Sequence, residues 1–317
     1  MKILVTGGSG YIGSVVVKRL LERGCEVTVF DDLVRGHRRN VPPEARLVVG
    51  DLRDAGAIRE AMAEARPDAV MHFAAYALVG ESMANPMMYF ANNVKGGVNL
   101  LEAMEAADCG RLIFSSSCAT YGVPDALPIE ETTPQRPTNP YGQSKLMFEQ
   151  MAGWLAQTKG FRPTFLRYFN AAGAVGELGE DHDPETHIIP NILKVAAGKK
   201  PFVEIYGDDY PTPDGTCIRD YVHIEDLASA HLLALEKEAV GAFNLGTGKG
   251  ASVKELVDAC RRVTGHPIPA RVLPRRPGDP PELYASGAKA RRELGWAPVR
   301  SDVDTIVRDA WAFHSSR

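Results

Sequence analysis

The first half of the chain alternates short apolar stretches with stripes of apolar residues at helical spacing. Stretches rich in apolar residues lie at 3–5, 26–30, 47–49, 69–73, 112–114 and 163–166. Such a stretch, bounded by turn residues, is typical of a strand that is buried on both faces. Longer segments at 92–106 and 141–157 predict helices. Strands that alternate with helices predict an α/β fold, in which helices cover both faces of a parallel sheet.

The pattern changes after about Gly173. Residues 174–187 form a polar stretch, and the elements beyond it are shorter, with proline-rich connections that are most marked at 267–281. We therefore expect two domains. The larger one covers 1–173, and a smaller one at 174–317 covers the crevice of the first.

Three glycines follow the first predicted strand. Gly7, Gly10 and Gly13 stand at the G-x-x-G-x-x-G spacing of a dinucleotide-binding turn, between a strand and a helix. Glycines there permit a tight turn and let the backbone approach a pyrophosphate at the helix amino terminus. Asp31 ends the next strand, where a carboxylate binds the ribose hydroxyls of NAD and repels the 2′-phosphate of NADP. The basic residues at 35–39 would suit NADP, but we interpret them as a solvated loop. The lysine of a P-loop is missing, which disfavours a nucleotide triphosphatase.

Tyr141 and Lys145 stand four positions apart in a predicted helix, so their side chains share one face. Thr138 or Asn139 can cap this helix, and Pro140 suits its first turn. Tyrosine has a pKa of about 10 and acts as a base only if that pKa falls. A cation at about 4 Å can lower it by about three units, so we expect Lys145 to supply much of that change. Such pairs also occur by chance, and this one gains meaning from the motifs upstream.

Three serines, at 115–117, follow the predicted strand at 112–114. Ligands of a doubly wound sheet bind at the carboxyl ends of its strands, so these hydroxyls would face the same crevice as the glycines. Ser115 and Ser116 are interpreted as residues that merely end the strand. Ser117 lies deepest in the following turn and is the candidate catalytic hydroxyl.

Together these motifs resemble a known family. The chain also contains GDLRD at 50–54 and HFAA at 72–75. Further matching segments are VGESMANPMMYFANNVKG, RYFNAAGA, DDYPTPDGTCIRDYVHIEDLA, FNLGTGKGASVKEL and RPGDPPELYAS, which extend over nearly the whole chain. The chain is similar to the extended short-chain dehydrogenases/reductases that act on nucleotide sugars, and among them to the UDP-sugar 4-epimerases.

The resemblance implies a fold and a reaction. The fold would be a Rossmann-type doubly wound parallel sheet with a smaller carboxyl-terminal substrate-binding domain, and a segment at about 218–238 would return to the first domain. The reaction would interconvert UDP-galactose and UDP-glucose through a 4-keto intermediate, by reversible hydride transfer from C4 to tightly bound NAD. Tyr141 would take the proton of the 4-hydroxyl, Lys145 would assist it, and Ser117 would share the proton path.

The resemblance also implies which residues bind the cofactor. Beside Tyr141 and Lys145, they are Gly7, Gly10, Tyr11, Ile12, Gly13, Asp31, Asp32, Leu33, Gly36, Asp51, Leu52, Phe73, Ala74, Ala75, Asn92 and Phe169. For the apolar members of this set, a packing role is an equal alternative. Ala77 stands where some epimerases have a lysine, so no polar role is expected there.

A third set would bind the UDP-sugar. It comprises Ser117, Tyr141, Asn170, Ile189, Tyr206, Arg219, Arg276 and Asp279. Guanidinium groups suit a diphosphate because their donors match its oxygens in fork geometry. Asp279 would bind the uridine ribose and Tyr206 would stack on uracil. Leu283 stands where some epimerases have a bulkier tyrosine, so N-acetylhexosamine, pentose and uronate substrates stay open.

Two competing functions are disfavoured by single residues. The related dehydratases and decarboxylases place an acid soon after the catalytic hydroxyl, whereas Cys118 and Ala119 stand there in this chain. A non-catalytic NAD-binding protein of this superfamily often loses the tyrosine, lysine or serine, and here all three are present.

Composition bounds the remaining possibilities. The chain has 317 residues, of which 44% are hydrophobic and 24% charged, and its net charge is −4. These values give no reason to expect a nucleic acid or a membrane as a partner. Its 5 cysteines lack C-x-x-C spacing, which suits a reducing compartment. The chain opens on an apolar strand without a signal peptide. We expect a cytoplasmic protein, and the family resemblance implies a homodimer that is formed through the helices at 92–106 and 141–157.

Asp181, His182, Asp183, Glu185 and His187 crowd one polar stretch. Histidine and carboxylate side chains are metal ligands, but these residues lack the ordered spacing of a metal site. We interpret the stretch as a mobile loop that covers the substrate, and we expect no metal.

Overall fold

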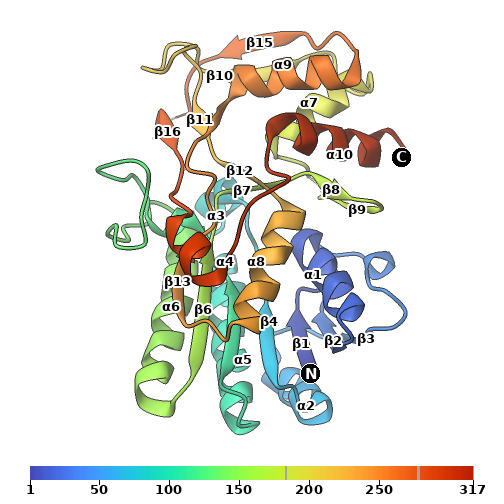
Figure 1. The fold of residues 1–317 in the computed structure, drawn as a ribbon, viewed down its shortest axis with the longest axis vertical. Helices are drawn as coiled ribbons and strands as arrows, with labels where there is room; N and C mark the ends of the chain where they lie inside the picture. Colours follow the sequence, from blue (N-terminus) through green and yellow to red (C-terminus); the bar gives the residue numbers. More distant parts are fainter. Residues whose placement is uncertain (183, 277–278, 317) are drawn as a thin grey trace.

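The computed structural model describes residues 1–182, 184–276 and 279–316 (Figure 1). Its centre is a seven-stranded sheet in the order β13-β6-β5-β4-β1-β2-β3, with parallel pairing throughout. The strands are β1 (Lys2–Thr6), β2 (Glu26–Asp31), β3 (Arg46–Val49), β4 (Ala69–His72), β5 (Arg111–Ser115), β6 (Arg162–Arg167) and β13 (Gly241–Asn244). The strand order reverses between β1 and β4, as in a doubly wound Rossmann-type sheet. The predicted fold class is confirmed.

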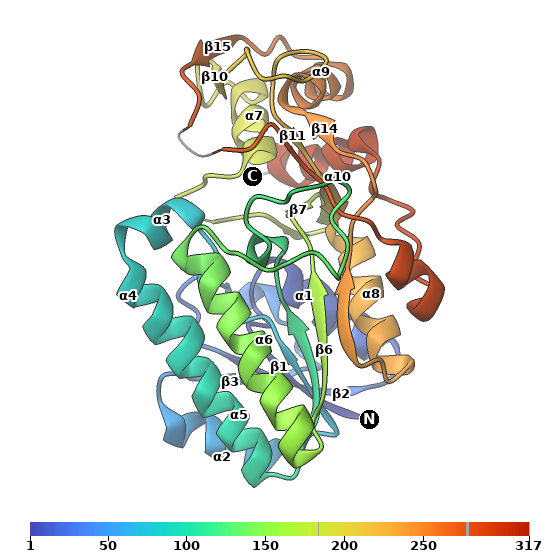
Figure 2. The same cartoon turned by 90° about the vertical axis from the view of Figure 1, so that its left-hand side faces the viewer.

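Helices cover both faces of this sheet (Figures 1 and 2). On one face lie α2 (Ala55–Ala65), α5 (Gly96–Ala106) and α6 (Pro140–Lys159), packed through Ile58, Leu100 and Phe148. On the other face lie α1 (Tyr11–Glu22) and α8 (Ile224–Glu236), which share a second apolar cluster with the sheet. Because every central strand is covered on both sides, its apolar stretch is continuous rather than alternating.

The helix predicted at 92–106 is not regular. After α3 (Val79–Ala84) and α4 (Pro86–Tyr89), the chain forms a π-helical segment, η2 (Phe90–Lys95), before α5 begins. Segments of this kind often occur near functional sites. The helix predicted at 141–157 has the expected start, because the Asn139 side chain accepts a bond of 2.8 Å from Gly142 N. It ends at Gly160, which has a positive φ of 71°.

A second apolar core lies beyond the carboxyl ends of the central strands, at the top of Figure 1. It joins α7 (Ile188–Ala196), α9 (Val253–Thr264) and α10 (Val303–Ser315) to the two-stranded sheet of β10 (Val203–Tyr206) and β15 (Ala270–Leu273). The shorter elements are β7 (Asn170–Ala172), β8 (Ala174–Val175), β9 (Leu178–Gly179), β11 (Ile218–Arg219), β12 (Tyr221–His223), β14 (Ala251–Ser252), β16 (Glu282–Leu283), and short 3₁₀ or π turns at Arg38–Asn40, Cys118–Thr120 and Ala290–Leu294. The division at Gly173 stays a prediction.

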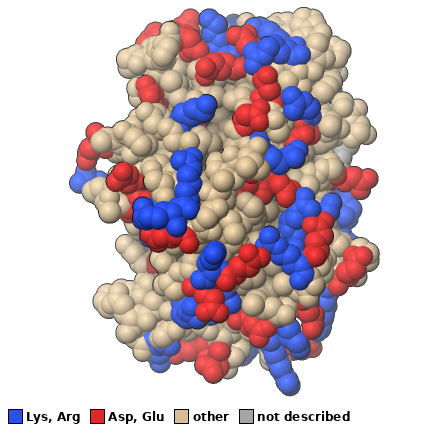
Figure 3. Space-filling model, viewed as in Figure 1, with Lys and Arg blue, Asp and Glu red and all other residues tan. Residues whose placement is uncertain are grey.

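On the face drawn in Figure 3, acidic and basic side chains are interspersed. No helix in the described part of the chain combines the length and apolarity that a membrane span requires.

Candidate active site

The candidate residues gather at the carboxyl edge of the sheet, beside the point where its strand order reverses. The glycine turn follows β1, Phe73 to Ala75 follow β4, and Ser115 to Ser117 follow β5. Phe73 N and Ala74 N both donate to Thr6 O, over 2.9 and 3.1 Å, so the ends of two neighbouring strands are held together. This edge is the usual ligand crevice of an open α/β sheet.

Two glycines of this turn, Gly7 and Gly13, leave no room for a side chain. A Cβ on Gly7 would lie 2.4 Å from Ala74 N, and one on Gly13 would lie 2.2 Å from Gly7 O. Gly10 is the N-cap of α1, and the first turn of this helix contains no acidic residue. The first N–H groups of α1 therefore retain the capacity to bind an anion, as a pyrophosphate-binding turn requires.

Asp31 ends β2 beside this turn and is 7% exposed. Its carboxylate accepts bonds from Ser9 N at 3.0 Å and Leu33 N at 2.9 Å. Among the described residues, the buried Ser9 Oγ has no hydrogen-bond partner. Gly36 is required here because a Cβ would lie 1.9 Å from Ser9 Oγ. A buried carboxylate and an unpaired hydroxyl beside a helix amino terminus fit the ribose and pyrophosphate of a dinucleotide.

Other predicted cofactor residues have mixed surroundings. Asp32 accepts a bond from Val34 N at 3.0 Å, and Asp51 forms an ion pair with Arg53. Leu52 is 8% exposed and belongs to the apolar core beneath α2 and α5, so its side chain packs.

Asn92 lies within the π-helical segment η2. Its amide donates to Asn93 Oδ1 at 3.0 Å, and Asn93 in turn donates to Ser144 Oγ at 2.9 Å. This segment is thereby attached to α6, one position before Lys145.

Tyr141 and Ser117 meet at this edge. Tyr141 is in the first turn of α6, and Ser117 is the N-cap of the short turn that follows β5. Ser117 is 6% exposed, and its Oγ accepts a bond from Ala119 N at 3.1 Å. Burial of the Tyr141 hydroxyl raises its pKa, and a side-chain hydrogen bond with Ser117 opposes that rise. Ser117 is therefore close enough to the phenol to lower its pKa.

Lys145 lies close to Tyr141, but its ammonium group is hydrogen-bonded to the end of strand β5. Its Nζ donates to Ser115 O at 2.7 Å and lies 5.9 Å from the centre of the Tyr141 ring. Burial lowers the pKa of Lys145 to about 7, and the charge of Glu149 opposes this fall. Burial raises the pKa of Tyr141. The expectation that Lys145 lowers this pKa stays a prediction.

A buried ion pair that the sequence did not reveal lies behind these residues. Glu149 and Arg167 have side chains that are 4% and 6% exposed, and Arg167 Nε donates to Glu149 Oε1 at 2.9 Å. Ser116 Oγ donates to the same carboxylate, and Ser115 is hydrogen-bonded to Tyr168. Both serines therefore have hydrogen-bond partners within the protein, which agrees with the interpretation that they merely end the strand. Glu149 stands four positions after Lys145, which was the only available signal for it in the sequence.

The predicted substrate residues form a second group on the carboxyl-terminal side. Arg219 forms an ion pair with Asp279, and its Nη1 donates to Ile218 O at 2.7 Å. The guanidinium of Arg276 lies 4.1 Å from the centre of the Tyr206 ring. Both arginines thus already have partners among the residues that were expected to bind the same ligand.

The remaining substrate candidates differ in exposure. Asn170 Nδ2 donates to Asp220 O at 2.9 Å, where β7 pairs with β12. Ile189 is 3% exposed, and its side chain packs in the second core. Phe169 and Leu283 are partly buried against the small apolar cluster around Cys118 and Tyr121.

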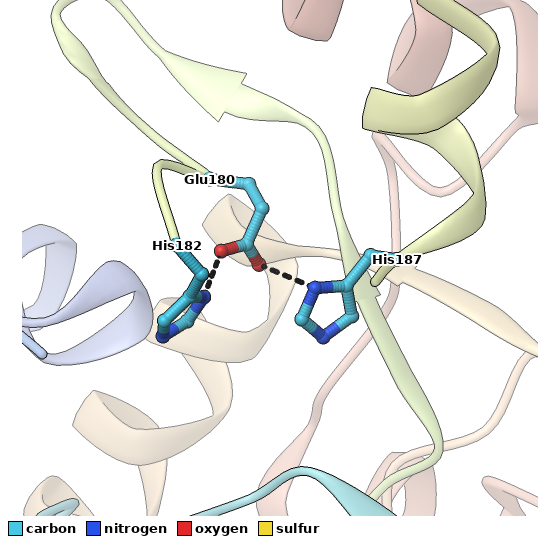
Figure 4. Close-up of side chains that lie close together, drawn as sticks. All are labelled: Glu180, His182 and His187. Atoms are coloured by element: carbon cyan, nitrogen blue, oxygen red, sulfur yellow. Dashed lines mark hydrogen bonds and ion pairs between the residues drawn. The ribbon is translucent and has the colours of Figure 1, made fainter. Parts of the chain in front are cut away.

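The polar stretch at 180–187 lies beside the glycine turn. Gly179 to His182 line one cavity with Ser9, Gly10 and Tyr11. Asp181 is paired with Arg39. Asp183 lies outside the described residues. The side chains of Glu180, His182 and His187 point toward one another (Figure 4).

Comparison with known proteins agrees with this geometry. The model of the NAD dependent epimerase/dehydratase family matches residues 3–246. A UDP-glucose 4-epimerase of Corynebacterium glutamicum is 52% identical over 319 residues, which cover 100% of this chain and 96% of that protein.

Two solved structures have the same fold. A UDP-glucose 4-epimerase of Brucella ovis in complex with NAD has a TM-score of 0.94 and 50% identity over 98% of this chain and 97% of its own. A UDP-glucose 4-epimerase of Bifidobacterium longum in complex with NAD⁺ and UDP has a TM-score of 0.94 and 38% identity over 100% and 99% of the two chains. This chain therefore belongs to the NAD dependent epimerase/dehydratase family.

Proposed function

We propose that this protein is a UDP-glucose 4-epimerase, which interconverts UDP-galactose and UDP-glucose with tightly bound NAD. The observation that supports the proposal is the convergence of Ser117, Tyr141 and Lys145 at the sheet edge that also holds the glycine turn. Full-length similarity to UDP-glucose 4-epimerases supports the substrate class.

The proposed chemistry assigns the proton to Tyr141. NAD, held by the glycine turn and Asp31, would supply the hydride acceptor for C4 of the sugar and, in its oxidised form, a positive charge. Tyr141 takes the proton of the 4-hydroxyl during oxidation and gives it back during reduction. Ser117 assists by donating to the phenolate, which lowers the pKa of Tyr141 against the effect of burial.

Lys145 supplies positive charge beside the same phenol only while it is protonated. Because burial brings its pKa to about 7, this charge depends on Glu149, which raises the pKa again. The buried Glu149–Arg167 pair thus has a proposed positioning role. It holds a fixed negative charge on the helical face of Lys145, without contact with the sugar.

The UDP moiety is assigned to the second group. Arg219 and Arg276 would hold the diphosphate, Asp279 the uridine ribose and Tyr206 the uracil. With UDP held at this end, the 4-keto sugar can turn about its bond to the diphosphate and present its opposite face for reduction. Since Asp279 already pairs with Arg219, ribose binding by Asp279 would leave this ion pair in place.

We also propose a homodimer, formed through the outer surfaces of α5 and α6. These helices lie side by side in Figure 2, and α6 carries Trp154, which is 65% exposed. A large aromatic side chain in contact with water is typical of a protein interface.

The cytoplasm and galactose metabolism are the proposed setting, since the reaction acts on UDP-galactose and the chain has 5 free cysteines. The domain division at Gly173 and the return of 218–238 remain part of this proposal.

The test is direct. Pure protein incubated with UDP-galactose, without added reductant, should form UDP-glucose, as measured by chromatography. Tyr141→Phe should lower kcat by at least about 100-fold, because it removes the proton acceptor, while UDP binding measured by calorimetry changes little. Near-normal turnover in Tyr141→Phe would refute the assignment.

A further inference from the structure

Glu180, His182 and His187 form a cluster that the proposed reaction does not use. They lie between β9 and the start of α7 (Figure 4). In the figure, the carboxylate of Glu180 stands between the two imidazole rings, whose centres are 5.7 Å apart. One donor atom from each of the three residues lies within 4.8 Å of the other two.

The donor atoms lie close together, with Glu180 and His182 in direct hydrogen-bond contact. Glu180 Oε1 contacts His182 Nδ1, and Glu180 Oε2 lies 3.6 Å from His187 Nδ1. Four-coordinate zinc has bonds of about 2.0–2.2 Å, which place neighbouring ligand atoms about 3.4 Å apart. Minor side-chain rotations would therefore bring all three atoms onto one ion. Two imidazole nitrogens and a carboxylate oxygen are a usual zinc donor set.

Charge and burial also favour a cation at this place. The side chains of Glu180 and Glu185 are 6% and 3% exposed, and both carboxylates approach the same nitrogen, Nδ1 of His187. One N–H cannot serve both acceptors well. Within the described ranges, the ion pairs of these two glutamates are with histidines, and none involves lysine or arginine. Two buried carboxylates without a permanent cation are costly.

The cluster has a structural consequence for the glycine turn. Gly179 to His182 line a cavity with Ser9, Gly10 and Tyr11. Tyr11 OH donates to Gly173 O at 2.6 Å, and Asp181 pairs with Arg39. An ion that links Glu180 to the start of α7 would fix this segment against the turn.

We propose that Glu180, His182 and His187 bind one Zn²⁺ ion, which fastens the segment at 179–188 beside the glycine turn. This proposal revises the expectation that the segment is a mobile loop without a metal. It is independent of the proposed reaction, because its readouts are metal content and stability rather than turnover.

The test uses the full-length protein. After purification without chelator or added metal, elemental analysis should find about one zinc per chain. Removal with a strong chelator should lower the unfolding temperature, and added ZnCl₂ should restore it. Co²⁺ in place of Zn²⁺ should produce the intense visible absorption of a four-coordinate site.

Variants locate the ion. Glu180→Gln removes the carboxylate charge and His187→Asn removes the imidazole, and each should weaken Zn²⁺ binding at least about 100-fold in competition with a chromophoric chelator. His266→Asn, an exposed histidine outside the cluster, is the matched control and should bind like wild type. Wild-type protein that neither contains nor binds zinc overturns the proposal, even if it epimerises normally. Iron or manganese in place of zinc, or unchanged affinity in both cluster variants, overturns it as well.

Discussion

Glu149→Gln tests the buried ion pair behind the candidate active site. The substitution preserves the size of the side chain but removes its charge. Arg167 would then remain charged at a site where its side chain is 6% exposed, and its Nε and Nη2 would lose a carboxylate partner. Ser116 and Gln135 also donate to this carboxylate. The variant therefore leaves a buried charge uncompensated in a network that was fully bonded.

Breaking a buried pair by removing one partner costs about 3–5 kcal/mol. For a large domain, each kcal/mol lowers the unfolding temperature by roughly 2–4 °C, so we expect a fall of at least about 6 °C. Glu105→Gln is the matched control. It makes the same substitution in a pair with Lys159 whose side chains are 44% and 55% exposed, and it should change stability little because solvent screens that pair.

Differential scanning calorimetry of wild type, both single variants and Glu149→Leu/Arg167→Met measures this effect. The double variant should recover part of the lost stability, because apolar side chains can replace a buried ion pair. An unfolding temperature of Glu149→Gln equal to that of Glu105→Gln would refute the reasoning. Activity gives a second readout. Loss of the Glu149 charge should lower the pKa of Lys145 below about 7, so activity should decline at a lower pH than in wild type.

Four further predictions follow from single contacts. Gly13→Ala should reduce the NAD that copurifies with the protein, because its Cβ would lie 2.2 Å from a backbone oxygen, whereas Gly153→Ala, with nothing within 4 Å, should not; nucleotide released on denaturation measures both. Leu283→Tyr should lower turnover of UDP-N-acetylglucosamine more than that of UDP-galactose, because Leu283 is partly buried near Cys118, and equal losses would contradict a role in pocket size. Trp154→Glu should shift the protein towards a monomer in light scattering. The stability of wild type relative to Lys145→Met should rise with pH from about 7 to about 10. With the folded pKa lowered to about 7, the unfolded chain binds more protons over that interval.

The sheet could be predicted because its signals are local. The observed strands β1, β4 and β6 begin or end within one residue of the apolar stretches at 3–5, 69–73 and 163–166. The cap of α6 by Asn139 follows from its own side-chain chemistry. The spacing of the three glycines is likewise visible within a short stretch of the sequence. Each of these features depends on residues that are close together in the sequence.

The features that were missed depend on residues brought together by the fold. The ion pair of Glu149 with Arg167 joins α6 to β6. The sequence does not show that these two charged side chains meet inside the protein. The orientation of Lys145 is set by the carbonyl of Ser115, 30 residues earlier in the chain. Glu180 was not predicted as a possible metal ligand. It approaches His187 only because the chain turns between β9 and α7.

The acid–base state of the candidate site therefore depends on groups behind it as well as on Tyr141. Burial raises the pKa of Tyr141 and lowers that of Lys145, so burial alone opposes both charges that proton transfer requires. The Ser117 hydrogen bond counters the first effect, and the charge of Glu149 counters the second. Since Arg167 keeps Glu149 paired in the interior, a residue that contacts neither the phenol nor the ammonium contributes to the charge of Lys145. The proposed base function of the Tyr-x-x-x-Lys pair therefore depends on charges that lie behind it.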